Sequence, residues 1–138
     1  MFCDIATGDL EAEIVFEDEV SLAFLDHRPL FAGHTLLIPR EHHETLVDLP
    51  SALVGPLFAN ARMLSRAVRD AMDAEGTFVA MNNKVSQSVP HLHVHVVPRR
   101  RKDGLRGFFW PRHRPKPGEM TGAAEAIRAA ITGAGAEG

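Results

Sequence analysis

Short runs in which apolar and polar residues alternate occupy much of the first hundred residues, and this pattern predicts β-strands. Residues 13–16 and 20–25 form two such runs, and the acidic stretch between them predicts a turn. Residues 35–38 predict a third strand, 78–82 a fourth and 91–97 a fifth.

Between residues 53 and 72 the apolar positions recur every three or four residues, which predicts one long amphipathic helix. Pro56 lacks an amide donor and crowds the preceding turn, so we expect the regular helix to begin later than Ser51. Residues 118–131 predict a short alanine-rich helix, and we expect residues 132–138 to be disordered. The apolar positions of the long helix are Leu53, Leu57, Phe58, Ala61, Leu64, Val68, Ala71 and Met72.

The order of these elements predicts the fold class. Strands, a helix and more strands without regular βαβ alternation indicate an α+β fold with an antiparallel sheet. A length of 138 residues suits one domain. We expect residues 1–116 to form that domain and residues 117–138 a C-terminal helix with a flexible tail.

Composition narrows the class of protein. The net charge of −3 argues against general nucleic-acid binding, and the single cysteine, Cys3, excludes an internal disulfide. No apolar run is long enough to span a membrane, and no signal peptide is evident, so we expect a cytoplasmic protein.

One segment, residues 99–116, departs from this acidic average. It carries eight basic residues against the single acidic Asp103, and Phe108, Phe109 and Trp110 interrupt it. Such a run usually faces solvent, which favours a basic linker whose aromatic residues dock on the rest of the protein. The alternative is that Trp110 or an arginine reaches the nucleotide site of the same or a partner subunit.

The most informative pattern is the run HLHVHVVPR, from His91 to Arg99. Because side chains on a strand alternate, His91, His93 and His95 should share one face, opposite an apolar face that packs. Buried imidazoles need partners, so this row predicts either a metal site or a site for an anion. The amide of Gln87 and the hydroxyl of Ser88 come just before it and favour the anion.

The run from His91 to Val97 resembles the signature of the histidine triad (HIT) family of nucleotide hydrolases and transferases, in which three histidines alternate with apolar residues. The preceding blocks resemble the family in the same order, so the likeness covers about residues 2–99. These blocks are residues 2–5, 7–9, 12–18, 23–26 and 33–39.

The resemblance implies a catalytic role for the row. In the family the middle histidine, here His93, attacks the α-phosphorus and forms a nucleotidyl-histidine that water resolves. His91, His95 and Gln87 complete the implied catalytic set, with His95 and Gln87 against the phosphate oxygens. Ser88 would lie near the α-phosphate or the leaving group.

The resemblance also implies a nucleotide site. Asp26 matches the carboxylate that binds both ribose hydroxyls, although an Asp before Arg28-Pro29 is also typical of a turn. His27 stands where the family usually has an apolar residue of the base pocket. Asn83 is the expected phosphate contact in a loop without glycine, where few positions should adopt positive φ, and Lys84 could face a leaving group. His34 and His42 match family histidines near the site.

No cofactor or metal is expected. Many relatives bind zinc through a Cys-x-x-Cys pair and histidines, whereas here Cys3 has only His42 and His91, so we predict no structural zinc.

The resemblance also implies a homodimer, because family members pair through the helix and an edge strand.

The predicted function is a nucleotidyl hydrolase or transferase that cleaves purine nucleoside phosphoramidates or dinucleoside polyphosphates. The sequence leaves the base and the leaving group open. One alternative is a non-catalytic nucleotide-binding regulatory protein. Another is a metal-dependent hydrolase that uses His91, His93 and His95 as ligands.

Overall fold

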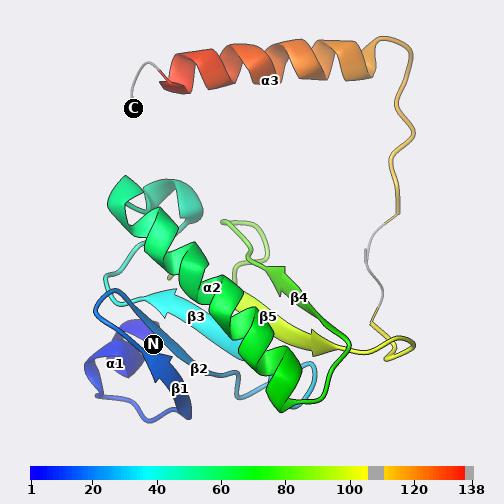
Figure 1. Ribbon diagram of the computed structural model, residues 1–138. Coiled ribbons are helices and arrows are strands. Elements are labelled where there is room, and N and C mark those ends of the chain that lie inside the picture. Colours follow the sequence, from blue (N-terminus) through cyan, green and yellow to red (C-terminus); the bar gives the residue numbers. More distant parts are fainter. Residues whose placement is uncertain (106–110, 136–138) are drawn as a thin grey trace. The chain divides into compact units, whose positions relative to one another are not determined.

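The computed structural model describes residues 1–105 and 111–135 (Figure 1). The chain divides into two units, Met1–Asp103 and Gly104–Gly138, which are described separately. The predicted boundary at residue 116 stays a prediction. The elements are α1 (Phe2–Thr7), β1 (Ile14–Glu17), β2 (Ser21–Leu25), β3 (Thr35–Pro39), the 3-10 turn η1 (Leu46–Asp48), α2 (Ser51–Ala71), β4 (Gly76–Ala80), β5 (Val94–Arg99) and α3 (Glu119–Gly135).

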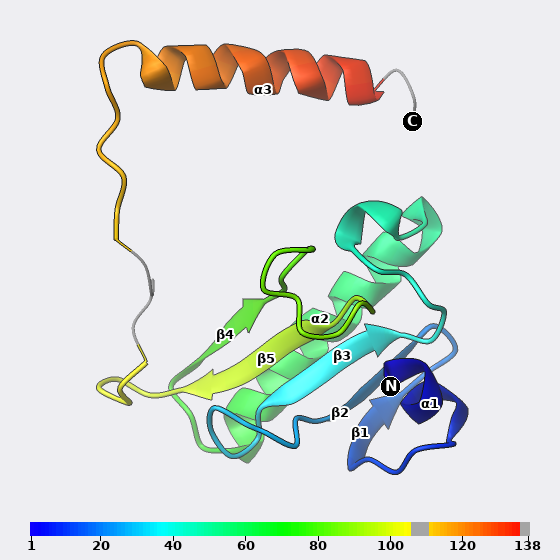
Figure 2. The same cartoon turned by 180° about the vertical axis from the view of Figure 1, so that it is seen from behind.

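The first unit contains a five-stranded antiparallel sheet in the order β1-β2-β3-β5-β4, which confirms the predicted α+β class. Helix α2 covers one face of this sheet and the short α1 lies against the other (Figures 1 and 2). The two helices therefore enclose the central strands between two apolar layers.

Alternation along the strands separates these layers. Ala23 and Leu37 point toward α2, whereas their neighbours Leu22 and Leu36 point toward α1. In the run from His91 to Val97, Leu92, Val94 and Val96 belong to the α2 layer and are 0% exposed. The ring of His93 instead packs edge-on against Phe2 of α1, at 5.0 Å between ring centroids. The predicted division into a packing face and a histidine face is confirmed.

Helix α2 begins at Ser51 and contains Pro56, so the prediction of a later start is wrong. The proline lies in the second turn, where its missing N–H removes one hydrogen bond of a 21-residue helix. The buried stripe of Leu57, Ala61, Leu64 and Val68 continues past it. Packing on the sheet outweighs this local cost.

Two strands differ from the prediction by more than one residue. β4 covers residues 76–80 where 78–82 was expected. β5 begins at Val94 where His91 was expected, because the amide of Leu92 donates to the carbonyl of His43 in a loop. His91 and His93 thus precede the ladder, although their side chains keep its alternation.

Helix α1 was not predicted, and α3 is longer than predicted. α1 ends at Gly8, whose left-handed backbone (φ 84°) lets its amide cap the helix. α3 continues to Gly135, so the expectation of disorder from Thr132 is wrong for residues 132–135, and 136–138 lie outside the described residues. None of the described helices combines the length and the apolar character that a membrane crossing requires.

Candidate active site

A cavity of about 390 Å³ lies on the α1 side of the sheet, lined by β3, β5, the turn after β2, the loop before β5 and the start of α1. It brings together five of the residues predicted for the site: Asp26, His27, Ser88, His93 and His95. The other lining residues are Met1, Phe2, Arg28, Leu36 and Val89. Phe2 is not among the predicted site residues, because α1 is not predicted, and Arg28 is predicted only as part of a turn.

His93 is held by the main chain two residues before it. Its side chain is 3% exposed, and its Nδ1 lies 2.8 Å from the carbonyl oxygen of His91. A carbonyl only accepts, so Nδ1 carries the proton and Nε2 carries the lone pair. The ring therefore presents a nucleophilic nitrogen without needing a base to deprotonate it.

His95 contacts a second buried histidine, His34, at the start of β3. The distance from His34 Nε2 to His95 Nδ1 is 3.0 Å. Burial lowers the pKa of His95 to about 4 and lowers the pKa of His34, against an opposing effect of Asp26 on both. Both imidazoles are therefore neutral at neutral pH.

Asp26 closes the opposite side of the cavity, just after β2. Its Oδ1 accepts the amide of Arg28 at 3.0 Å, and its Oδ2 lies 3.7 Å from His34 Nε2. The turn and the ligand site predicted for Asp26 are thus compatible, since only one oxygen is used by the turn.

The ring of His91 does not line this cavity. Its Nε2 donates to the carbonyl of Pro39 at 3.0 Å, and its Nδ1 lies 3.4 Å from Cys3 Sγ. What His91 supplies to the site is its carbonyl oxygen, which orients His93. This placement favours a positioning role for His91 over direct contact with the phosphate.

Gln87 and Asn83 are tied to a neighbouring loop. Gln87 Nε2 donates to the carbonyl of Glu44 at 2.6 Å, and Asn83 Oδ1 accepts the amide of Leu46 at 2.7 Å. Lys84 pairs with the carboxylate of Glu44 at 2.8 Å. Of the predicted phosphate contacts from residues 83–88, the cavity lining includes only Ser88.

The loop around Lys84 also corrects an expectation about its backbone. Lys84 and Ser86 adopt positive φ, 71° and 62°, although neither is glycine. The amide of Lys84 donates to Gln87 Oε1 at 3.0 Å, and Asn82 donates to the carbonyl of Ser86. These bonds stabilise a conformation that the sequence alone disfavours.

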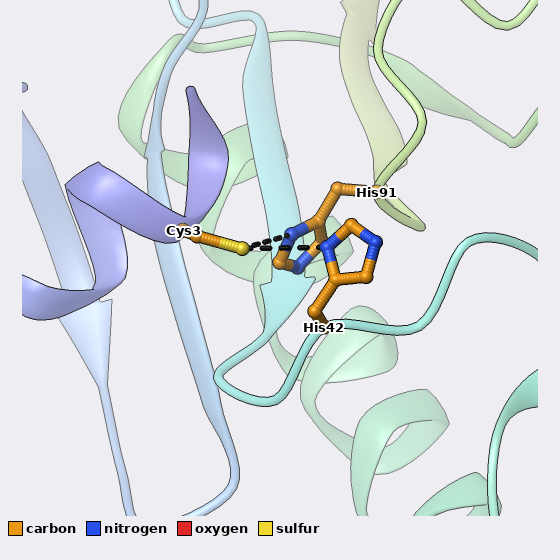
Figure 3. Close-up of side chains that lie close together, drawn as sticks. All are labelled: Cys3, His42 and His91. Atoms are coloured by element: carbon orange, nitrogen blue, oxygen red, sulfur yellow. Dashed lines mark hydrogen bonds between the residues drawn. The ribbon is translucent and has the colours of Figure 1, made fainter.

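Cys3, His42 and His91 form a cluster that is not part of the cavity lining, with the thiol pointing at both rings (Figure 3). Sγ lies 3.3 Å from His42 Nδ1 and 3.4 Å from His91 Nδ1. A tetrahedral zinc would place sulfur and nitrogen ligands about 3.5 Å apart. Ala6, three residues after Cys3, offers no fourth donor. The cluster therefore has three of the four donors of a closed structural zinc site, and its thiol lies within hydrogen-bonding distance of both rings.

The histidine triplet itself does not converge on one point. His91 turns toward Cys3, whereas His93 and His95 face the cavity. Within residues 1–105 and 111–135, no group of donors suited to a metal combines the three triplet histidines. This arrangement opposes a metal-dependent hydrolase built on the triplet.

The basic segment is described only in part. Arg99 makes two bonds to Asp103, at 2.6 and 3.0 Å, and the amide of Arg101 donates to Glu75. These contacts agree with a segment whose charges face solvent or pair locally. Phe108, Phe109 and Trp110, and with them the alternative in which Trp110 reaches the site, lie outside the described residues.

Comparison with known proteins identifies the family. The HIT domain family model matches residues 7–102, which is more than half of the chain. The chain belongs to the HIT family. The protein hit of Bacillus subtilis is 38% identical over 115 residues, covering 82% of this chain and 79% of that protein. An adenosine 5'-monophosphoramidase of Schizosaccharomyces pombe is 32% identical over 133 residues, covering 95% and 97%.

Solved structures agree with this fold. SMU.412c from Streptococcus mutans superposes with a TM-score of 0.87 at 36% identity, over 95% of this chain and 84% of that chain. A zinc-bound histidine triad protein from Mycobacterium smegmatis gives 0.72 at 38% identity, over 96% and 95%. The HIT family includes nucleotide hydrolases, as the monophosphoramidase shows.

The lowered pKa values of His34 and His95 predict a pH-dependent stability. Below about pH 6.5 the unfolded chain binds protons at these histidines, whereas the folded protein does not until about pH 4 at His95. The free energy of unfolding should therefore fall as pH decreases through this window. Urea unfolding at several pH values measures it, and His95→Gln should flatten the profile. An equal slope in wild type and variant would contradict this assignment.

The missing fourth donor predicts that folding does not require zinc. Phe2 and Ile5 already anchor α1 in the apolar layer, at 5% and 7% exposure. Dialysis against EDTA should leave the Tm of the wild type unchanged and equal to that of the treated Cys3→Ser variant. A Tm that EDTA lowers and added zinc restores, in the wild type alone, would show a structural metal.

Proposed function

We propose that this HIT protein is a nucleotidyl hydrolase or transferase that acts on purine nucleoside phosphoramidates or dinucleoside polyphosphates. The observation that carries the proposal is the hydrogen bond from His93 Nδ1 to the His91 carbonyl, which leaves a lone pair on Nε2 beside the cavity. A non-catalytic binding protein would need no such orientation of one imidazole.

Two adjoining cavities support a nucleotide as the substrate. The cavity lined by His93 and His95 adjoins a larger cavity of about 920 Å³. The two share Met1, Phe2, Asp26 and His27. The larger one is lined mostly by apolar residues, which suits a base. The other lining residues of this cavity are Ile5, Gly8, Leu10, Glu11, Ala12, Glu13, Ile14, Phe24 and Leu25.

Asp26 stands where the two cavities meet, so a ribose there would link a base in the larger cavity to a phosphate beside His93. Its carboxylate can accept hydrogen bonds from two adjacent hydroxyls. His27 lines both cavities, and Arg28 lines the one beside His93. We propose this order of base, ribose and phosphate along the two cavities.

The proposed reaction has two displacements. His93 Nε2 attacks the α-phosphorus, a P–N bond forms, and the bond to the leaving amine or phosphate breaks with its electron pair on the leaving group, which as an amine takes up a proton from solvent. Water then attacks the same phosphorus and gives a proton back to solvent, the P–N bond breaks, and the nucleoside monophosphate leaves while His93 recovers its lone pair. His95 and Ser88 would stabilise the charge on the phosphoryl oxygens, and the proposed roles of Gln87 and Asn83 require their loop to rearrange around substrate.

A homodimer is part of the proposal. In the described sheet, β4 is an edge strand, bonded on one side to β5. Beside it a groove of about 510 Å³ runs between β4 and α2, with Phe58 and Val79 39% and 43% exposed. An unpaired edge next to exposed apolar side chains favours pairing with a second copy.

We also propose a cytoplasmic location, where a free thiol such as Cys3 stays reduced.

The activity is tested with an adenosine phosphoramidate, its guanosine analogue and diadenosine tetraphosphate. Wild type should release the nucleoside monophosphate from at least one of them, and His93→Ala should lose about a thousandfold or more in kcat. The variant should still bind adenosine monophosphate, because Asp26 and the larger cavity are unchanged.

His113→Ala, an exposed change in the second unit, is the matched control and should keep full activity. Tight nucleotide binding without turnover of any substrate would favour the binding-protein alternative. Full activity in His93→Ala would exclude the proposed nucleophile.

A further inference from the structure

His34 uses both of its ring nitrogens. Its side chain is 3% exposed, its Nδ1 receives the amide of Leu30 at 3.1 Å, and its Nε2 lies 3.0 Å from His95 Nδ1. A backbone N–H can only donate, so His34 Nδ1 is the acceptor. A neutral imidazole has one N–H, which is therefore on Nε2 and is donated to His95.

The contact with His34 also determines the tautomer of His95. Because its Nδ1 accepts from His34, the proton of its neutral ring is on Nε2. His93 has the reverse arrangement, with the proton on Nδ1 and the lone pair on Nε2. The two neighbouring rings, 5.1 Å apart between centroids, therefore hold opposite tautomers.

We propose that His34 is a positioning residue that fixes His95 as an Nε2–H donor, while the His91 carbonyl fixes His93 as an Nε2 nucleophile. The cavity then presents one attacking nitrogen and one neutral hydrogen-bond donor to the same phosphoryl group. The catalytic consequence rests on the proposed function, whereas the tautomers do not.

The backbone around His34 is built to hold this arrangement. The loop from Asp26 to His34 is closed by the amide of Asp26 on the His34 carbonyl at 2.9 Å and the amide of His34 on the Phe31 carbonyl at 3.0 Å. Gly33 has φ 94°, and a Cβ there would lie 2.6 Å from Met72 Cγ. The Leu30 amide that selects the tautomer is thus part of a fixed loop.

The alternative use of these groups is a metal site, because Asp26, His34 and His95 lie close enough to share an ion. A nitrogen that bears a proton cannot bind a metal. Since the Leu30 amide places the proton of His34 on Nε2, the side of His34 that faces Asp26 and His95 is a donor. Burial also disfavours protonation of both rings, which keeps each of them with a single N–H.

The proposal is tested first by NMR of protein with ¹⁵N-labelled histidine, which reads the protonation of each ring nitrogen without substrate. Wild type should show His95 protonated on Nε2 and His93 on Nδ1. His34→Gln keeps a donor near the Nε2 position and should leave His95 unchanged. His34→Leu, of similar volume, offers no donor and should let the His95 proton move to Nδ1. A proton on His95 Nδ1 in the wild type, or the same His95 tautomer in both variants, would overturn the proposal.

Kinetics on the same pair tests the catalytic consequence. Losing one hydrogen-bond donor to a transition-state oxyanion lowers kcat about a hundredfold, so His34→Leu should fall by that factor with little change in KM. His34→Gln should stay within a few-fold of wild type. Equal kcat values in the two variants would exclude the positioning role. The proposed function alone fails if the tautomers are as predicted and the wild type turns over no substrate, and the tautomer proposal alone fails if the wild type is active with His95 protonated on Nδ1.

Discussion

The hydrogen bond between His93 Nδ1 and the carbonyl of His91 is the contact on which the proposed chemistry depends. At 2.8 Å it places the proton of a buried imidazole on one nitrogen and leaves the other free to attack. The carbonyl can do this because His91 is itself fixed, through Nε2, to the carbonyl of Pro39 in β3. The proposed nucleophile is therefore oriented by the main chain of two segments, and not by a flexible base.

The sheet supplies the frame for this contact. Leu92, Val94 and Val96 are fully buried under α2, which leaves the alternate histidines on the α1 face. On that face Phe2 packs against His93 and also borders both cavities. One apolar residue of α1 thus excludes water from the ring and helps to shape the proposed nucleotide site. One run of residues can supply both the polar site and the apolar packing, because successive side chains point to opposite faces of the sheet.

The sequence predicted the features that follow from periodicity. The antiparallel sheet, the long helix and the two faces of the triad run all have signals that extend over several residues. It failed where tertiary contacts decide: α1 is too short for a helical period, Pro56 is tolerated because α2 packs, and β4 is two residues earlier than expected. It also could not foresee that His91 turns to Cys3 or that Gln87 binds the Glu44 carbonyl. Side-chain direction depends on partners distant in sequence.

The nucleophile at His93 is tested most directly by stopping the reaction with labelled nucleotide within one turnover and mapping the label by mass spectrometry. The orientation of Nε2 toward the cavity predicts one nucleotidyl group per chain, attached to His93, that forms before product appears and is absent from His93→Ala. Product release in the wild type with no adduct at any time, or with the label on another residue, would contradict the account.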